Sequence, residues 1–197
     1  MTWKSIAGET PIDDLSGLKV PGITTRAQLN LHEAENIRKA TVNYLASRPP
    51  VRRAPFTVAW MLQVHEQMFG DVWEWAGTPR RTQKNLGVPA YQILDELKKL
   101  EDDIAFWTAN QTMTPAEVSA RIHHRGVFIH PFENGNGRWA RMLANVWLRR
   151  EGHSLVRWPE KTIGDVSVER ETYLTAIRAA DHGDLRELID LHERWSG

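Results

Sequence analysis

The 197-residue sequence contains no cysteine, so the chain can form neither disulfides nor thiolate metal sites. It also has no apolar run close to the ~18 residues of a membrane-spanning helix, and its first residues lack a signal-peptide hydrophobic stretch. Lysine plus arginine equal aspartate plus glutamate at 25 each, so no overall basic field favours nucleic acid. These absences predict a cytoplasmic protein with no membrane role and no direct nucleic-acid binding.

The apolar residues that are present predict one all-α domain. A hydrophobic share of 41% in a chain of this length is typical of a single globular core. Residues 1–24 are polar and contain two prolines, and are expected to form an N-terminal arm before a domain at 25–197. Apolar positions recur at helical spacing in the segments 25–48, 55–70, 93–110, 115–129, 136–152, 166–180 and 184–195. The expected fold is thus a bundle of six or more helices with a short β-hairpin at 78–93.

A glycine-containing turn precedes the helix expected from Asn136. Gly135 and Gly137 can adopt backbone dihedrals closed to other residues, so successive N–H groups can converge on one point. The free amides and the dipole of a helix N-terminus also favour negative charge. This turn is therefore predicted to bind an anion, although most glycine turns before helices serve only to reverse the chain.

Charged and titratable side chains flank the turn. Arg138 and Arg141 are three residues apart in the first turns of the helix, so both guanidinium groups can reach the same phosphate oxygens. His130 precedes the turn and could take a proton from an attacking hydroxyl. The spacing matches neither a Walker A loop nor a dinucleotide-binding fingerprint.

Residues 130–141 read His-Pro-Phe-Glu-Asn-Gly-Asn-Gly-Arg-Trp-Ala-Arg, which resembles the signature of the Fic/Doc family at eleven of twelve positions. The exception is Asn134, where the family has an acidic metal ligand. With the upstream segment 69–77, the variant is similar to the branch called mobile mystery protein B. The resemblance implies a Fic fold and a protein adenylyltransferase, which transfers AMP from ATP to a hydroxyl side chain of a target protein.

The resemblance also implies a role for each residue of the signature. His130 would deprotonate a serine, threonine or tyrosine of the target, and Phe132 would anchor the loop in the core. The expected phosphate-binding residues are Gly135, Asn136, Gly137, Arg138 and Arg141. Mg²⁺ is the expected cofactor, but it prefers anionic oxygen ligands, so the amide of Asn134 predicts weakened magnesium affinity.

The segment 31–36 resembles the inhibitory motif of the same family, apart from Leu31 at its Ser/Thr position. In that motif Glu35, followed by Asn36, would pair with Arg141 and keep ATP from binding productively. Glu33 is a rival for this role. The alternative is that the segment is simply a charged, solvated face of the helix.

The hairpin expected at 78–93 corresponds to the Fic flap, which holds the target peptide by strand addition. Its predicted docking residues are Arg81, Thr82, Gln83, Lys84 and Asn85. Arg80, Arg81 and Lys84 could instead be ordinary surface charge. His65, His123 and His124 lack the partners of a metal site and are expected to be packing or surface residues.

Other functions remain open on the same frame. They are UMP transfer, phosphorylation, removal of AMP, or a catalytically weak nucleotide-binding module, for which Asn134 is the argument. The family context suggests a toxin–antitoxin or regulatory role. The target is not identified by the sequence, and the oligomeric state, including a homo-oligomer, stays open.

Overall fold

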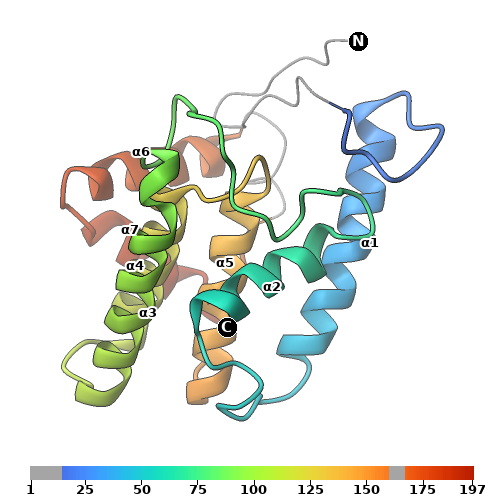
Figure 1. Ribbon diagram of the computed structural model, residues 1–197. Coiled ribbons are helices and arrows are strands. Elements are labelled where there is room, and N and C mark those ends of the chain that lie inside the picture. Colours follow the sequence, from blue (N-terminus) through green and yellow to red (C-terminus); the bar gives the residue numbers. More distant parts are fainter. Residues whose placement is uncertain (1–14, 160–166) are drawn as a thin grey trace.

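The computed structural model describes residues 15–159 and 167–197, so residues 1–14 of the expected arm lie outside it. The all-α class is confirmed (Figure 1). The described helices are α1 (Arg26–Leu45), α2 (Val58–Phe69), the 3-10 turn η1 (Ala90–Gln92), α3 (Ile93–Asn110), α4 (Pro115–Ile129), α5 (Asn136–Glu151), α6 (Val168–Asp181) and α7 (Arg186–Arg194). None of the helices in these two ranges is both long and apolar enough to cross a bilayer.

Hydroxyl side chains set the starts of several helices. Thr25, Thr57, Thr114 and Ser167 each accept a hydrogen bond from a backbone N–H in the first turn of the following helix. At α1, Gln28 bonds back to the N–H of Thr25 and completes a capping box. These caps fix where the helical segments begin, and α2 accordingly starts three residues after Pro55.

The signature helix α5 lies at the centre of the bundle, between α4 on one side and α1 and α2 on the other (Figure 1). Its inward side chains Trp139, Leu143 and Val146 are fully buried. A helix buried on several sides in this way is held rigidly by its neighbours. The N-terminus of α5 therefore forms a fixed platform for the loop that precedes it.

The expected hairpin at 78–93 is a loop in the structure, followed by the 3-10 turn η1. The Arg80 N–H donates to the Pro131 carbonyl at 2.8 Å, and the Val88 N–H points to the Ile129 carbonyl at 3.4 Å. The ends of the loop thus bond to the chain around His130 rather than to each other. Pro79 and Pro89, which lack an N–H, flank the loop and further limit pairing across it.

Candidate functional site

The loop before α5 is held in shape by its own side chains. The Asn136 amide donates to the Phe132 carbonyl and accepts from the Phe132 N–H, both at 2.9 Å. Gly135 has a φ of +79°, and a Cβ there would approach the Phe69 ring to 2.6 Å. Gly137 instead lies in the first helical turn without a positive φ, so only Gly135 uses the glycine freedom expected of both.

His65, expected to be a packing or surface residue, supports this loop from α2. Its ring stacks on Phe132 at 3.6 Å between centroids. The Gly77 N–H donates to Nδ1 at 3.0 Å, so Nε2 carries the proton and donates to the Asn134 carbonyl, also at 3.0 Å. Burial lowers the pKa of His65 to about 3, which keeps this bridge neutral.

His130 ends α4 in the left-handed conformation, with φ of +52°. The side chain is 8% exposed. Burial lowers its pKa to about 4, helped by the charges of Arg80 and Lys84, while a hydrogen bond to the Val127 carbonyl and the charge of Glu133 oppose the shift. The imidazole is consequently neutral at physiological pH and can accept a proton.

Arg138 faces α1 from the first turn of α5. Its Nη1 donates to Glu33 Oε2 at 2.6 Å, and its Nη2 to Asn134 Oδ1 at 3.3 Å. Glu33 is only 2% exposed, and its other oxygen accepts from Trp73 Nε1 at 2.8 Å. Arg138 is thus held by a buried carboxylate at the edge of the signature loop.

Arg141 lies one turn further along α5. Its guanidinium carbon is 5.6 Å from the ring centroids of both Trp158 and Tyr173, within the range of cation–π attraction. Burial lowers the pKa of Arg141, although a guanidinium remains charged at any physiological pH. Arg138 and Arg141 therefore both lie near the N-terminus of α5, and His130 lies at the start of the loop that leads into this helix.

Residues 55–148 match the model of the Fic/DOC family. This chain carries a Fic/DOC family domain. It is 33% identical over 138 residues to the protein adenylyltransferase fic-1 of Caenorhabditis elegans, an alignment that covers 66% of this chain and 25% of that protein. The chain thus spans about a quarter of that curated relative.

Two solved structures share the fold. Residues 134–508 of Fic-1 from C. elegans superpose with a TM-score of 0.66 at 26% identity, covering 89% of this chain and 50% of that one. The N-terminal Fic domain of a putative cell filamentation protein from Bartonella quintana, with bound ADP, gives a TM-score of 0.67 at 25% identity. That match covers 90% of this chain and 88% of the other.

In this Fic/DOC domain, the prediction that Glu35 pairs with Arg141 is wrong. Glu35 has a side chain 53% exposed and pairs with Arg38 one turn along α1. Asn36, expected beside it in the inhibitory motif, is buried and instead bonds the Gln67 carbonyl and the Asp71 N–H. The buried face of α1 brings the rival Glu33, not Glu35, to the signature.

The oxygen ligands around Asn134 do not fit a resident magnesium ion. Its Oδ1 already accepts from the Gly135 N–H at 2.6 Å as well as from Arg138. The neighbouring Glu133 turns toward the flap, where it pairs with Lys84 at 2.6 Å. Among the described residues no cluster of three or more histidine or acidic side chains could hold a metal. The one acidic side chain of the signature is thus paired with Lys84, and the Asn134 amide oxygen already accepts two hydrogen bonds.

The predicted docking residues of the flap fall into two groups. Arg81, Gln83 and Asn85 are exposed, while Lys84 and Thr82 contact the carboxylate of Glu133, the latter at 3.3 Å. Arg80, considered as surface charge, is buried. No periodic pattern predicts this burial, because the residue lies in an irregular segment.

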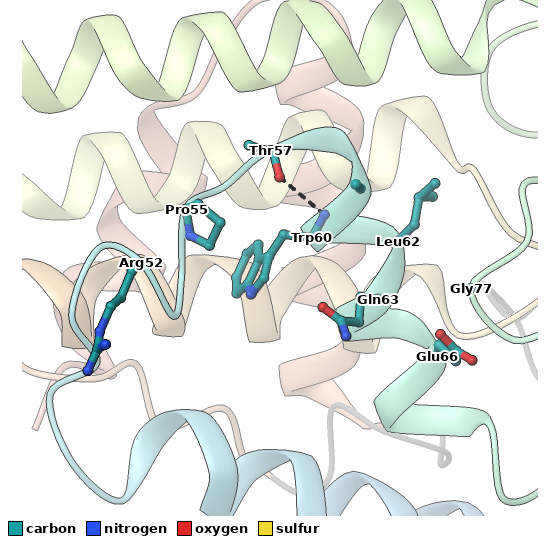
Figure 2. A pocket seen from close by; sticks show the side chains of 9 residues that line it. Arg52, Pro55, Thr57, Trp60, Leu62, Gln63, Glu66 and Gly77 are labelled. Carbon is teal, nitrogen blue, oxygen red and sulfur yellow. Dashed lines mark hydrogen bonds between the residues drawn. The ribbon is translucent and has the colours of Figure 1, made fainter.

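A hollow of about 540 Å³ opens on the outer face of α2 (Figure 2). Trp60 and Glu66 line it, and the figure also shows the Thr57 hydroxyl capping the Trp60 N–H. Within the described part of the chain, its lining includes no residue of the signature. The hollow is therefore separate from the candidate site.

Proposed function

We propose that this chain transfers AMP from ATP to a hydroxyl side chain of a target protein. The observation that supports this most strongly is the neutral imidazole of His130 on the same rigid loop as the N-terminus of α5. Arg138 and Arg141 add two positive charges to that helix end. The name protein adenylyltransferase, carried by the C. elegans relative, supports the same chemistry.

In the proposed reaction the target oxygen attacks the α-phosphorus of ATP. The bond from that phosphorus to the β-phosphate oxygen breaks, and pyrophosphate leaves with the electron pair. His130 takes the proton of the hydroxyl, which it can do because its ring is neutral. The amides at the start of α5 and the two arginines would stabilise the charge on the phosphate oxygens. The product is a protein–AMP phosphodiester.

The test is labelling of candidate target proteins, and of the chain itself, with ATP carrying the label on either the α- or the γ-phosphate. We expect transfer of the α-label only, and an intact mass increased by one AMP. His130→Ala should abolish the label, whereas the exposed His182→Ala should not. Transfer of the γ-label would indicate phosphorylation, and a label unaffected by His130→Ala would refute the proposed base.

We further propose that Glu33 restrains the reaction. Its carboxylate bonds the Arg138 guanidinium that the phosphates of ATP would otherwise bind. Glu33 is buried and also fixed by Trp73, so the contact is maintained without a partner protein. The domain is therefore proposed to have low basal activity, which should rise when the Glu33 charge is removed.

A further inference from the structure

Arg80 is buried at the base of the flap, with 3% of its surface exposed. Its Nε donates to the His130 carbonyl at 2.8 Å, Nη1 to the Thr82 carbonyl at 2.8 Å, and Nη2 to the Val88 carbonyl at 2.5 Å. Burying a guanidinium costs free energy unless its donors are satisfied. Here the acceptors are three convergent main-chain carbonyls, so the side chain is oriented by the backbone of two separate segments.

These contacts join the flap to the end of α4. The N–H of Arg80 also donates to the Pro131 carbonyl at 2.8 Å, so this one residue bonds the two successive carbonyls of His130 and Pro131. Thr82 and Val88 stand at the two ends of the flap loop. A single side chain therefore connects both ends of the loop to the residue that carries the imidazole.

The backbone at His130 needs such support. A residue with a Cβ adopts the left-handed conformation only at a cost in free energy, and His130 has φ of +52°. The flap packs directly against it: a Cβ at Gly87 would lie 2.4 Å from the Cβ of His130 and 2.9 Å from Nη2 of Arg80. A change of backbone conformation at His130 that reoriented its carbonyl would break the bond to Arg80.

We propose that Arg80 is a positioning residue for the transfer reaction, which holds His130 in its left-handed conformation and closes the flap loop beside the imidazole. The inference rests on the proposed role of His130 as the base. Arg80 does not itself contact the nucleotide in this assignment. It acts through the main chain of His130 and through the two ends of the flap.

The charge of Arg80 has a second effect on the same imidazole. The charged groups facing His130 are Arg80 and Lys84, which lower its pKa, and Glu133, which raises it, while burial is the largest cause of the low value of about 4. Loss of the Arg80 charge should raise the pKa of His130. Protonation would then begin at a pH where the wild-type ring is still neutral.

The test compares Arg80→Met with Arg150→Met in the full chain. Arg150 is also buried, at 8% exposed, and donates to the Ala54 carbonyl at 2.8 Å, but it lies at the far end of α5. We expect kcat for AMP transfer to fall roughly 10- to 100-fold in Arg80→Met, since a misplacement of about 1 Å can cost about 100-fold. The KM for ATP should change much less. Arg150→Met should lower the unfolding temperature but leave kcat of the folded protein unchanged.

A second readout does not depend on activity. The ¹⁵N chemical shifts of the His130 ring, followed by NMR from pH 8 to 5.5, should stay at neutral values in the wild type and in Arg150→Met. In Arg80→Met they should move toward protonated values as the pH falls. If the wild type shows no transfer, the proposed function fails, but these shifts still test the positioning role.

Arg80→Lys covers the case in which Arg80→Met does not fold. It keeps the charge but cannot reach three carbonyls at once, so we expect neutral ring shifts, altered from the wild type, together with a kcat reduced by roughly tenfold. The proposal is overturned if a folded Arg80 variant keeps both the wild-type kcat and the wild-type His130 shifts.

Discussion

Asn134 offers a neutral amide oxygen, whereas an acidic residue at this position would offer a negatively charged ligand to a magnesium ion. We predict that Asn134→Asp lowers the magnesium concentration for half-maximal transfer by about tenfold, the effect of roughly 1.4 kcal/mol. The measurement is a magnesium titration of α-label transfer. Glu133→Gln is the matched control, because that carboxylate faces Lys84 and its loss should leave the midpoint unchanged. An equal midpoint in the wild type and Asn134→Asp would contradict the prediction.

The two candidate inhibitory carboxylates can be separated by isosteric variants. Glu33→Gln keeps an acceptor for Trp73 but removes the charge that holds Arg138, so ATP-dependent labelling should rise by roughly tenfold, since charge-assisted bonds contribute about 1.5–3 kcal/mol. Glu35→Gln alters only an exposed pair with Arg38 and should leave the rate unchanged. Initial labelling rates at one ATP concentration decide between them. Activation by Glu35→Gln alone would reverse the assignment.

The sequence contained a signal for Glu33 that the motif comparison did not use. The buried residues of α1 are Leu29, Glu33, Asn36, Ala40 and Tyr44, spaced at intervals of three and four. Glu33 lies on this face, and Glu35, two positions on, points to another. The positions of the residues expected to bind phosphate were easier to predict, because one loop and the start of one helix carry them all. The burial of Arg80 depends on carbonyls far away in the sequence and could not be predicted from local pattern.

At the scale of elements, α1 packs into the hydrophobic core and is not a separately folding segment on the surface. Leu29 is fully buried, whereas Leu31, two residues further along the helix, is 71% exposed. We predict that Leu29→Ala lowers the free energy of unfolding by about 2–5 kcal/mol, because it leaves a cavity, and that Leu31→Ala changes it by less than about 0.5 kcal/mol. Urea denaturation of both variants measures the difference.

Two unfolding transitions instead of one in Leu29→Ala would contradict this account, since they would show α1 unfolding separately from the rest.

The core position of α1 also limits how the proposed restraint by Glu33 can be released. Release of Arg138 would have to come from movement of the Glu33 side chain, because undocking of the helix would expose Leu29, Ala40 and Tyr44. Helix positions were predicted well from apolar spacing, whereas the flap conformation was not, since its main-chain bonds are to residues 129–131.

At the scale of the whole molecule, a chain of buried hydrogen bonds joins α4, α6 and α7. The Ser119 hydroxyl donates to the Ala116 carbonyl at 3.0 Å, so His192 Nδ1 must donate to Ser119 at 2.7 Å. His192 Nε2 then accepts from His123 Nδ1 at 3.1 Å, and His123 Nε2 accepts from the Tyr173 hydroxyl, also at 3.1 Å. Each ring carries one proton, and a second proton on His192 would place two N–H donors against each other.

This arrangement predicts acid sensitivity of the fold. Burial lowers the pKa of His192 and His65 to about 3 and that of His123 well below 6.5, so the unfolded chain binds protons that the folded chain excludes. This contribution to stability is present above pH 6.5 and is lost as the pH falls below it, by on the order of 1 kcal/mol per pH unit for each histidine. Three such groups acting together remove a substantial part of the roughly 5–15 kcal/mol that stabilises a typical domain.

Urea denaturation at pH 7.5, 6.5, 5.5 and 5.0 measures this loss. We expect the free energy of unfolding to begin to fall between the first two values, because histidines in the unfolded chain titrate near pH 6.5, and to fall more steeply below them. His192→Gln removes one titrating ring and keeps an amide that can bond Ser119, so its stability should be lower at pH 7.5 but fall less steeply on acidification. A wild-type stability that stays constant down to pH 5.0 would mean that the buried rings accept protons, and that the one-proton hydrogen-bond chain is wrong.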